Sequence, residues 1–220
     1  MNNCIGILVS YLYIALVIIG AKIFEKRGKE ASRKFIHIML GNWWFIAMYY
    51  FTNVWFAAFV PTTFIIINYL SYKKDIIKVM ERDQQDGLGT VYYATSLLIL
   101  VIVSFGIYKM TSLGLIPNLV MAYGDGLAAL FGKAIKSKKY KLGDSKKSTA
   151  GSITMFVIST ILIGGYLAFW HQVEFCATPH WPLVSALIGF AITAIEAISV
   201  KGTDNITVPL GTLCMLLLIG

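Results

Sequence analysis

The 220-residue chain is 57% hydrophobic and only 14% charged, whereas a soluble domain carries about 25% charged residues. Such a shortage of charge excludes an ordinary soluble globular protein. The formal net charge of +8 would raise the question of nucleic-acid binding in a soluble protein, but lysines and arginines gathered on one side of a membrane explain it more simply.

Eight hydrophobic segments follow one another along the chain, and each is expected to form a helix because an open sheet cannot span lipid. The predicted helices cover residues 5–24, 35–52, 54–72, 90–108, 111–131, 150–170, 182–200 and 206–218. The last segment is short, so seven helices remain possible. The first segment lacks the flanks of a signal peptide and is expected to be retained. With no internal repeat, the sequence predicts one all-α, polytopic transmembrane bundle over residues 1–220.

Basic residues fall on alternate loops. Six lie in residues 22–34, four in 72–89 and seven in 132–149, and Lys201 follows the seventh predicted helix. Lys109 alone lies on the other side. The positive-inside rule therefore predicts a multi-pass protein whose long loops and active face are cytoplasmic, with both termini outside if eight helices form.

Asp125 lies within the fifth predicted helix, about seven residues or roughly 10 Å above its inner end. A carboxylate at such a depth costs about 2.5–3.5 kcal/mol on insertion scales and needs a metal ion, a basic partner or a water-filled cleft. The flanking Gly124 and Gly126 let a ligand or another backbone approach closely. A functional carboxylate is favoured over one that only pairs with a lysine between packed helices.

Glu196 lies in the seventh predicted helix, five residues before Lys201. The fifth and seventh helices run in the same direction, so Asp125 and Glu196 are expected at one level of the inner leaflet. Because hard cations take oxygen ligands, this pair predicts a Mg²⁺ site. The alternative, in which burial keeps one acid protonated, stays open.

A lysine-rich loop leads into the sixth predicted helix. A helix N-terminus suits phosphate because its backbone N–H groups are free and its dipole end is positive. The first lysines, Lys136 to Lys141, are interpreted as a topology signal, and Ser148 also fits a plain N-cap. The residues predicted to bind phosphate are Lys146, Lys147, Ser148, Thr149, Gly151 and Ser152.

Two smaller groups complete the predicted inner face. Arg33, Lys34 and His37 open the second predicted helix, and the i, i+4 spacing places Arg33 and His37 on one side of it. They are candidates to contact phosphate or the hydroxyl of a lipid, although a lone interfacial histidine is also compatible with a purely structural role. Asp204 and Asn205 precede the last helix, where Asn205 either caps the helix or faces a nucleotide.

Together these motifs resemble the diacylglycerol/polyprenol kinase family, which includes dolichol kinase, phytol kinase and CTP-dependent diacylglycerol kinase. The resemblance covers most of the chain and rests on the order, spacing and common membrane side of the motifs. These are Arg33-Lys34-Phe35-Ile36-His37, Gly89-Thr90-Val91-Tyr92-Tyr93, Gly124-Asp125-Gly126 with Gly132, Lys146-Lys147-Ser148 with Gly151-Ser152, and Glu196 followed by Asp204-Asn205 and Pro209.

The resemblance implies a CTP-dependent kinase that uses Mg²⁺ to phosphorylate a membrane lipid alcohol, such as a polyprenol, phytol or diacylglycerol. It implies that Asp125 and Glu196 bind the metal or activate the hydroxyl. It also implies that the triphosphate and nucleotide are held by Lys146, Lys147, Ser148, Gly151, Asp204 and Asn205, beside Gly124 and Gly126.

Two other functions were weighed against a lipid kinase. A phosphatidate cytidylyltransferase also uses CTP, but its Pro-Gly-His-Gly-Gly stretch followed by aspartates is not found in the sequence. A small ion-coupled transporter would use Asp125 and Glu196 as a relay, although transporters commonly contain internal repeats. The reaction products separate the first alternative from a kinase, and uptake into proteoliposomes separates the second.

Overall fold

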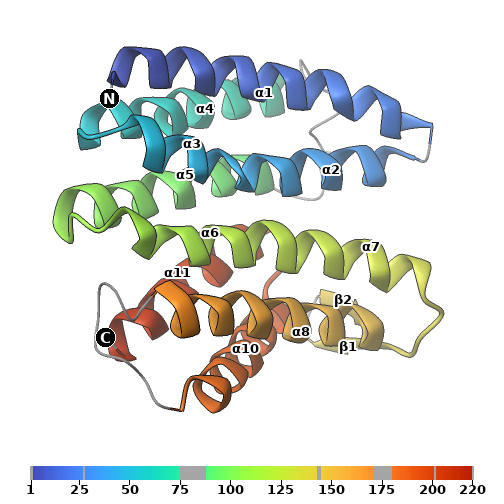
Figure 1. The fold of residues 1–220 in the computed structure, drawn as a ribbon. Helices are drawn as coiled ribbons and strands as arrows, with labels where there is room; N and C mark the ends of the chain where they lie inside the picture. The colour runs from blue at the N-terminus through green and yellow to red at the C-terminus, as the bar shows by residue number, and fades with distance from the viewer. Residues whose placement is uncertain are drawn as a thin grey trace.

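The computed structural model describes residues 2–26, 28–74, 88–142, 145–170, 180–200 and 202–219. Helices make up nearly all of this part of the chain and pack into one bundle (Figure 1). In chain order they are α1 (Asn3–Glu25), α2 (Lys29–Gly41), α3 (Trp43–Tyr50), α4 (Val54–Lys74), α5 (Gly89–Val101), η2 (Ile102–Ile107), η3 (Thr111–Gly114), α6 (Leu115–Leu119), η4 (Val120–Asp125), α7 (Gly126–Ala134), α8 (Thr149–Gly165), η5 (Tyr166–Trp170), α10 (Trp181–Ile198) and α11 (Asp204–Ile219).

Six helical stretches in the described residues are long and apolar enough to cross a membrane. They are α1, α4, α5 continued by η2, the stretch from η3 to α7, α8 continued by η5, and α10. The predicted all-α transmembrane bundle is therefore confirmed.

The other two predicted segments differ from continuous spanning helices. The second is divided at Asn42 into α2 and α3, and α11 has only 16 residues. The second segment also begins at Lys29 rather than at residue 35, which places Arg33, Lys34 and His37 inside a helix. Hydrophobicity missed this first turn because its buried residues are polar: the Ser32 hydroxyl donates to the carbonyl of Ala21 at 2.9 Å.

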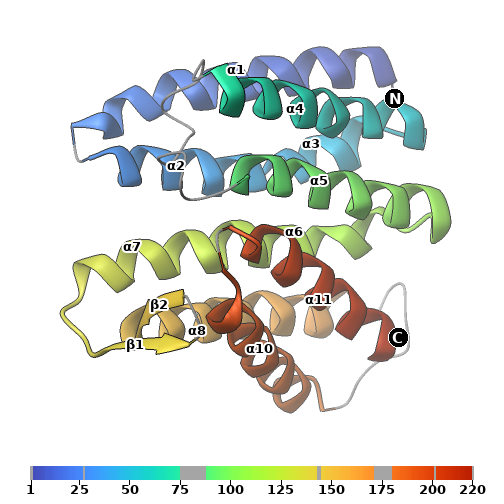
Figure 2. The same ribbon diagram turned by 180° about the vertical axis from the view of Figure 1, so that it is seen from behind.

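The two termini lie at one end of the bundle, and the α1–α2 and α7–β1 connections lie at the opposite end (Figures 1 and 2). This arrangement agrees with an even number of passes. Which end faces the cytoplasm stays a prediction. Part of the second basic loop, residues 75–87, lies outside the described part of the chain.

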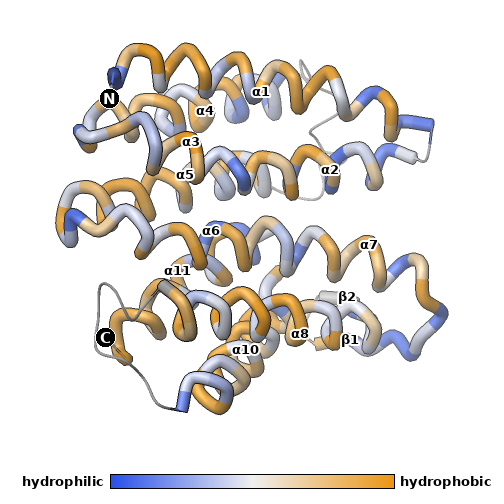
Figure 3. Tube along the Cα trace, viewed as in Figure 1, coloured by the Kyte–Doolittle hydropathy of each residue, from blue (hydrophilic) through white to orange (hydrophobic). Residues whose placement is uncertain are grey.

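Hydrophobic residues predominate along the helices, as Figure 3 shows. Many large apolar side chains are exposed on the outside of the bundle, and many polar side chains are buried inside it. Leu8 is 69% exposed, whereas Ser10 and Asn118 are fully buried. The Asn118 amide donates to the carbonyl of Gly41 at 2.6 Å, and the Trp43 indole donates to the Ser10 hydroxyl at 2.9 Å. Because lipid is itself apolar, such hydrogen bonds and close packing hold membrane helices together.

A small antiparallel hairpin, which the sequence did not predict, links α7 to α8. Its strands are β1 (Lys139–Leu142) and β2 (Ser145–Ser148), and Tyr140 pairs with Lys147. The hairpin lies outside the six apolar stretches, so it does not conflict with a helical membrane region. Pairing with β1 fixes the position of β2, which leads directly into α8.

Gly114 and Gly165 provide a matched test of helix packing. A Cβ on Gly114 would lie 2.2 Å from Cζ2 of the buried Trp44, whereas a Cβ on Gly165 would meet nothing within 4 Å. Gly114→Ala is therefore expected to lower the free energy of unfolding by about 1–3 kcal/mol, as overpacking does. Gly165→Ala is expected to be neutral, or to raise the free energy of unfolding by up to about 1 kcal/mol. Thermal unfolding in detergent measures both, and equal midpoints would contradict the packing described here.

Candidate active site

Three acidic side chains meet inside the bundle, each supplied by a different element. Asp125 ends η4, Glu196 lies in the last turn of α10, and Asp204 begins α11. One carboxylate oxygen from each lies within 4.8 Å of the others. Asp125 is 7% exposed and Glu196 is 4% exposed, so these two acids are held away from solvent, whereas the Asp204 side chain is 17% exposed. Buried carboxylates this close together need either cations beside them or a proton on one of them.

The helix that carries Asp125 is locally widened. Segment η4 is π-helical, a rare conformation that frequently occurs at functional sites. Glycines lie on both sides of Asp125: a Cβ on Gly124 would lie 2.8 Å from Sδ of Met155, and one on Gly126 would lie 2.4 Å from Cγ1 of Ile38. The two glycines thus allow α8 and α2 to pack closely against this helix. Their contact with a nucleotide stays a prediction.

Lys34 and His37 of α2 both contact Asp125. The Lys34 ammonium donates to Oδ2 of Asp125 at 2.5 Å, and Lys34 is only 3% exposed. Nε2 of His37 lies 3.3 Å from the same oxygen and 3.1 Å from the carbonyl oxygen of Met121. Because both neighbours accept hydrogen bonds, Nε2 is the nitrogen that carries a hydrogen. A basic partner thus compensates the buried charge of Asp125.

Lys147 of β2 supplies the second cation of the cluster. Its ammonium donates to Oε1 of Glu196 and lies 3.8 Å from Oδ2 of Asp204. Burial by itself lowers the pKa of Lys147, but the carboxylates of Glu196 and Asp204 outweigh that effect and raise the pKa above its ordinary value. Lys147 therefore stays charged across the physiological range. The side chain of Lys146 lies outside the described part of the structure.

The start of α8 is capped by its own surroundings. Ser148 is the N-cap and accepts from the N–H of Gly151 at 3.1 Å. The N–H of Thr149 donates to the carbonyl of Lys138 at 2.9 Å, and that of Ala150 donates to the hydroxyl of Ser137 at 3.2 Å. The N–H groups of the first three α8 residues are therefore already engaged, so a phosphate here would rely on lysine side chains or would have to displace these bonds.

The remaining phosphate candidates on α8 also have structural partners. A Cβ added to Gly151 would lie 3.0 Å from the carbonyl oxygen of Ala128, a tight contact, so glycine favours the close packing of α7 and α8. The Ser152 hydroxyl shares a hydrogen bond with the hydroxyl of Tyr140, and Thr149 donates to the carbonyl of Lys138. These contacts hold the hairpin against α8. Phosphate binding by these residues stays a prediction.

The starts of α5 and α11 meet beside the acid cluster. The Asn205 amide donates to the carbonyl of Gly89 at 3.1 Å, while Oδ1 of Asn205 is buried without a hydrogen-bond partner among the described residues. Gly202 has a φ of 80°, and it lies close to Gly89. A Cβ added to Gly202 would be only 2.8 Å from Cα of Gly89. Two motifs that are 116 residues apart in the sequence are thereby joined.

Arg33, a predicted contact for phosphate or the lipid hydroxyl, has an acidic partner on its own helix. Its guanidinium pairs with Glu30 at 2.6 Å, and its Nε is buried without a partner among the described residues. Asn68 of α4 is a site residue that the sequence reasoning missed: it is 6% exposed and donates to the carbonyl of Thr90 at 3.0 Å. An asparagine after three isoleucines in an apolar segment was the signal that could have revealed it.

The acid cluster fits a Mg²⁺ ion in its ligand chemistry and nearly in its dimensions. Ligand oxygens on opposite sides of an octahedral Mg²⁺ are about 4.2 Å apart, since each lies 2.0–2.1 Å from the ion. The observed limit of 4.8 Å therefore needs only a small inward movement. The three carboxylates are contacted by two ammonium groups, from Lys34 and Lys147, which leaves room for further positive charge.

The comparison with known proteins identifies the family. A phytol kinase from Synechocystis is 31% identical over 205 residues, which cover 91% of this chain and 85% of that protein. The chain therefore belongs to the polyprenol/phytol kinase family. A probable chloroplastic phytol kinase 1 of Glycine max is 31% identical, and the chloroplastic phytol kinase 1 of Arabidopsis thaliana is 28% identical; the chain spans 65% of each. No family model and no solved structure matches the chain.

As a member of the polyprenol/phytol kinase family, the protein is a lipid-alcohol kinase. This result confirms the resemblance to the diacylglycerol/polyprenol kinases, and it favours a kinase over the cytidylyltransferase and the transporter. The structure adds Asp204 to the predicted pair of acids and Lys34 as the partner of Asp125. The contact of Asp204 with the other two acids was not predicted, and a lysine partner for Asp125 was the alternative interpretation, without Lys34 being named.

Proposed function

We propose that the protein transfers the γ-phosphate of CTP to the hydroxyl of an isoprenoid alcohol of the phytol class at the cytoplasmic face of a membrane. The observation that carries this proposal is the meeting of three carboxylates and two lysines inside the bundle, contributed by α2, the η4–α7 helix, β2, α10 and α11. Phytol kinases among the relatives support the acceptor, and the distribution of lysine and arginine supports the membrane side.

In this proposal Asp125, Glu196 and Asp204 hold Mg²⁺, which would neutralise negative charge on the phosphates. Lys147 then leaves Glu196 and binds a phosphate oxygen, and Lys146 is the second candidate for that role. The alcohol oxygen forms a bond to the γ-phosphorus as the bond to the bridging oxygen breaks. The products are a phosphorylated alcohol and CDP, and the hydroxyl proton passes to a carboxylate of the acid cluster.

The proposal predicts which labelled nucleotide marks the lipid. Purified protein in detergent with Mg²⁺ should transfer label from γ-labelled CTP to phytol, and more slowly from γ-labelled ATP. Farnesol, a polyprenol and diacylglycerol complete the panel, and thin-layer separation identifies the products. Chelation of the divalent cation with EDTA should stop the transfer.

Labelling at a second position distinguishes the alternatives. With α-labelled CTP the label should remain in CDP, because only the terminal phosphate moves. Label from the α-phosphate in the lipid would instead indicate a cytidylyltransferase. Failure to label any alcohol from either nucleotide would contradict the proposal.

A further inference from the structure

A polar pocket lies directly beside the acid cluster. It encloses about 410 Å³ including its open side, and Arg33, His37 and Asn205 are among its lining residues. His37 contacts Asp125, and Asn205 follows Asp204 in the chain, so both join the pocket to the acids. A group bound in this pocket would therefore be next to the acid cluster.

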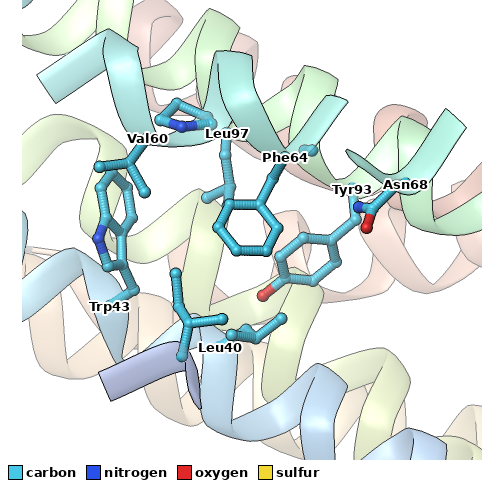
Figure 4. Close-up of a pocket in the computed structure, with 10 residues that line it drawn as sticks. Leu40, Trp43, Val60, Phe64, Asn68, Tyr93 and Leu97 are labelled. Atoms are coloured by element: carbon cyan, nitrogen blue, oxygen red, sulfur yellow. The ribbon is translucent and has the colours of Figure 1, made fainter. Parts of the chain in front are cut away.

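An apolar pocket lies between α1, α2, α3, α4 and α5, with about 370 Å³ of empty space including its open side. Trp43, Val60, Phe64 and Leu97 line it, as Figure 4 shows. Because ligand pockets are mostly apolar, such a lining suits the hydrocarbon chain of a lipid alcohol.

The two pockets share part of their walls. Leu40, Asn68 and Tyr93 line both of them. The Tyr93 hydroxyl donates to the carbonyl of His37 at 3.2 Å, and the Asn68 amide donates to the carbonyl of Thr90 at 3.0 Å, so hydrogen bonds hold both polar side chains in place. The polar pocket and the apolar pocket are therefore neighbours that share one wall.

Two buried atoms indicate which polar group the first pocket accepts. Nε of Arg33 is an unpartnered donor and Oδ1 of Asn205 is an unpartnered acceptor, among the described residues. Both residues line the polar pocket. An ionised carboxylate or a fully deprotonated phosphate could satisfy only the donor, because it has no hydrogen to give, whereas a hydroxyl both donates and accepts. A hydroxyl group is therefore able to serve both atoms.

We propose that these two pockets form one substrate site, in which the hydroxyl of the lipid alcohol lies between Arg33 and Asn205 and the first prenyl units fill the cavity lined by Trp43, Val60 and Phe64. This inference rests on the proposed kinase function and specifies where its acceptor binds. Leu40 belongs to the wall that the two pockets share, so in this proposal the chain passes beside Leu40 to enter the apolar part.

Leu40→Trp tests the passage, with Leu12→Trp on the lipid-facing side of α1 as its matched control. The indole at Leu40 should lower kcat/KM for phytol by at least about tenfold, the low end of what steric mismatch in an apolar pocket costs. The five-carbon alcohol prenol, whose short chain depends less on the apolar pocket, should be affected less. The KM for nucleotide should not change.

Phe64→Ala tests the opposite change, with the 50% exposed Phe59 of α4 as the site of the control substitution. Enlarging the cavity should alter the ranking of farnesol, phytol and bulkier branched alcohols, and Phe59→Ala should preserve it. Two results would overturn the substrate site. One is an unchanged ranking of the alcohols in both Leu40→Trp and Phe64→Ala. The other is an equal loss of kcat/KM for prenol and phytol in Leu40→Trp.

A binding measurement separates this inference from the proposed function. A saturated phytol analogue with bromine midway along its chain should quench the tryptophan fluorescence of the intact protein, and Trp43→Phe should remove most of the quenching. Quenching that persists in Trp43→Phe contradicts the site even in an active enzyme. Quenching without phosphorylation of any alcohol would support the site but contradict the kinase.

Discussion

Asp125→Asn is expected to lower phosphoryl transfer by at least about 100-fold, the loss that follows removal of one group that stabilises transition-state charge. Asparagine keeps the shape of the side chain but removes the negative charge that the acid cluster offers to a metal ion. The change is measured as formation of phosphorylated alcohol from γ-labelled CTP in detergent. Glu25→Gln is the matched control, because Glu25 is an exposed acid at the end of α1.

The same substitution leaves Lys34 buried without its carboxylate, and breaking a buried ion pair costs about 3–5 kcal/mol. Loss of folding would then imitate loss of catalysis. The double variant Asp125→Asn/Lys34→Met removes both charges and should recover much of the thermal stability while remaining inactive. Activity in either variant once it is folded would remove Asp125 from the mechanism.

Lys147→Met is expected to produce the second large effect, an approximately 100-fold loss of transfer with a raised KM for CTP, because a charge-assisted contact to phosphate is lost. The same substitution should strengthen the binding of a divalent metal ion. In the absence of nucleotide the Lys147 ammonium contacts Glu196 and Asp204, so it competes with a cation for these carboxylates. The affinity of the nucleotide-free protein for Mn²⁺ should therefore rise.

Lys141→Met controls for the general charge of the hairpin, since Lys141 is exposed on the neighbouring strand. It should leave both the KM for CTP and the Mn²⁺ affinity near their original values. Mn²⁺ titration followed by electron paramagnetic resonance reports metal binding without turnover. Weaker Mn²⁺ binding in Lys147→Met, or unchanged transfer, would contradict the role assigned to Lys147.

The fold was predictable where hydrophobicity alone decides it. Long apolar runs predicted α1, α4, α8 and α10 to within a few residues of their ends. The prediction failed at α2, where Ser32 and Lys34 are buried because each has a partner in the interior. Hydrophobicity scales assign such residues to loops, since a scale includes no term for a partner that lies elsewhere in the chain.

The candidate site was predictable in its acids but not in their pairing. Asp125 and Glu196 each lie within an apolar segment, where a buried carboxylate costs free energy. A cation site shared by the two acids was predicted because it would offset this cost. Asp204 joins them because the chain turns back after α10 with a positive φ at Gly202, a geometry that the sequence does not reveal. Similarly, the sequence is compatible with two roles for the hydroxyl groups of Ser148, Thr149 and Ser152. They could bind phosphate, or they could make the local hydrogen bonds that the structure contains.

The ion pair between Lys34 and Asp125 also bears on how the protein is made. Lys34 precedes its partner by 91 residues, so at roughly 5 to 20 residues per second the ribosome needs about 5 to 20 s to supply Asp125. Until then the ammonium is stable only near the head groups, where a long side chain can reach water. Helix α2 is therefore expected to stay near the membrane surface until the fifth apolar segment has been made. Insertion of this helix and assembly of the acid cluster would then be one event.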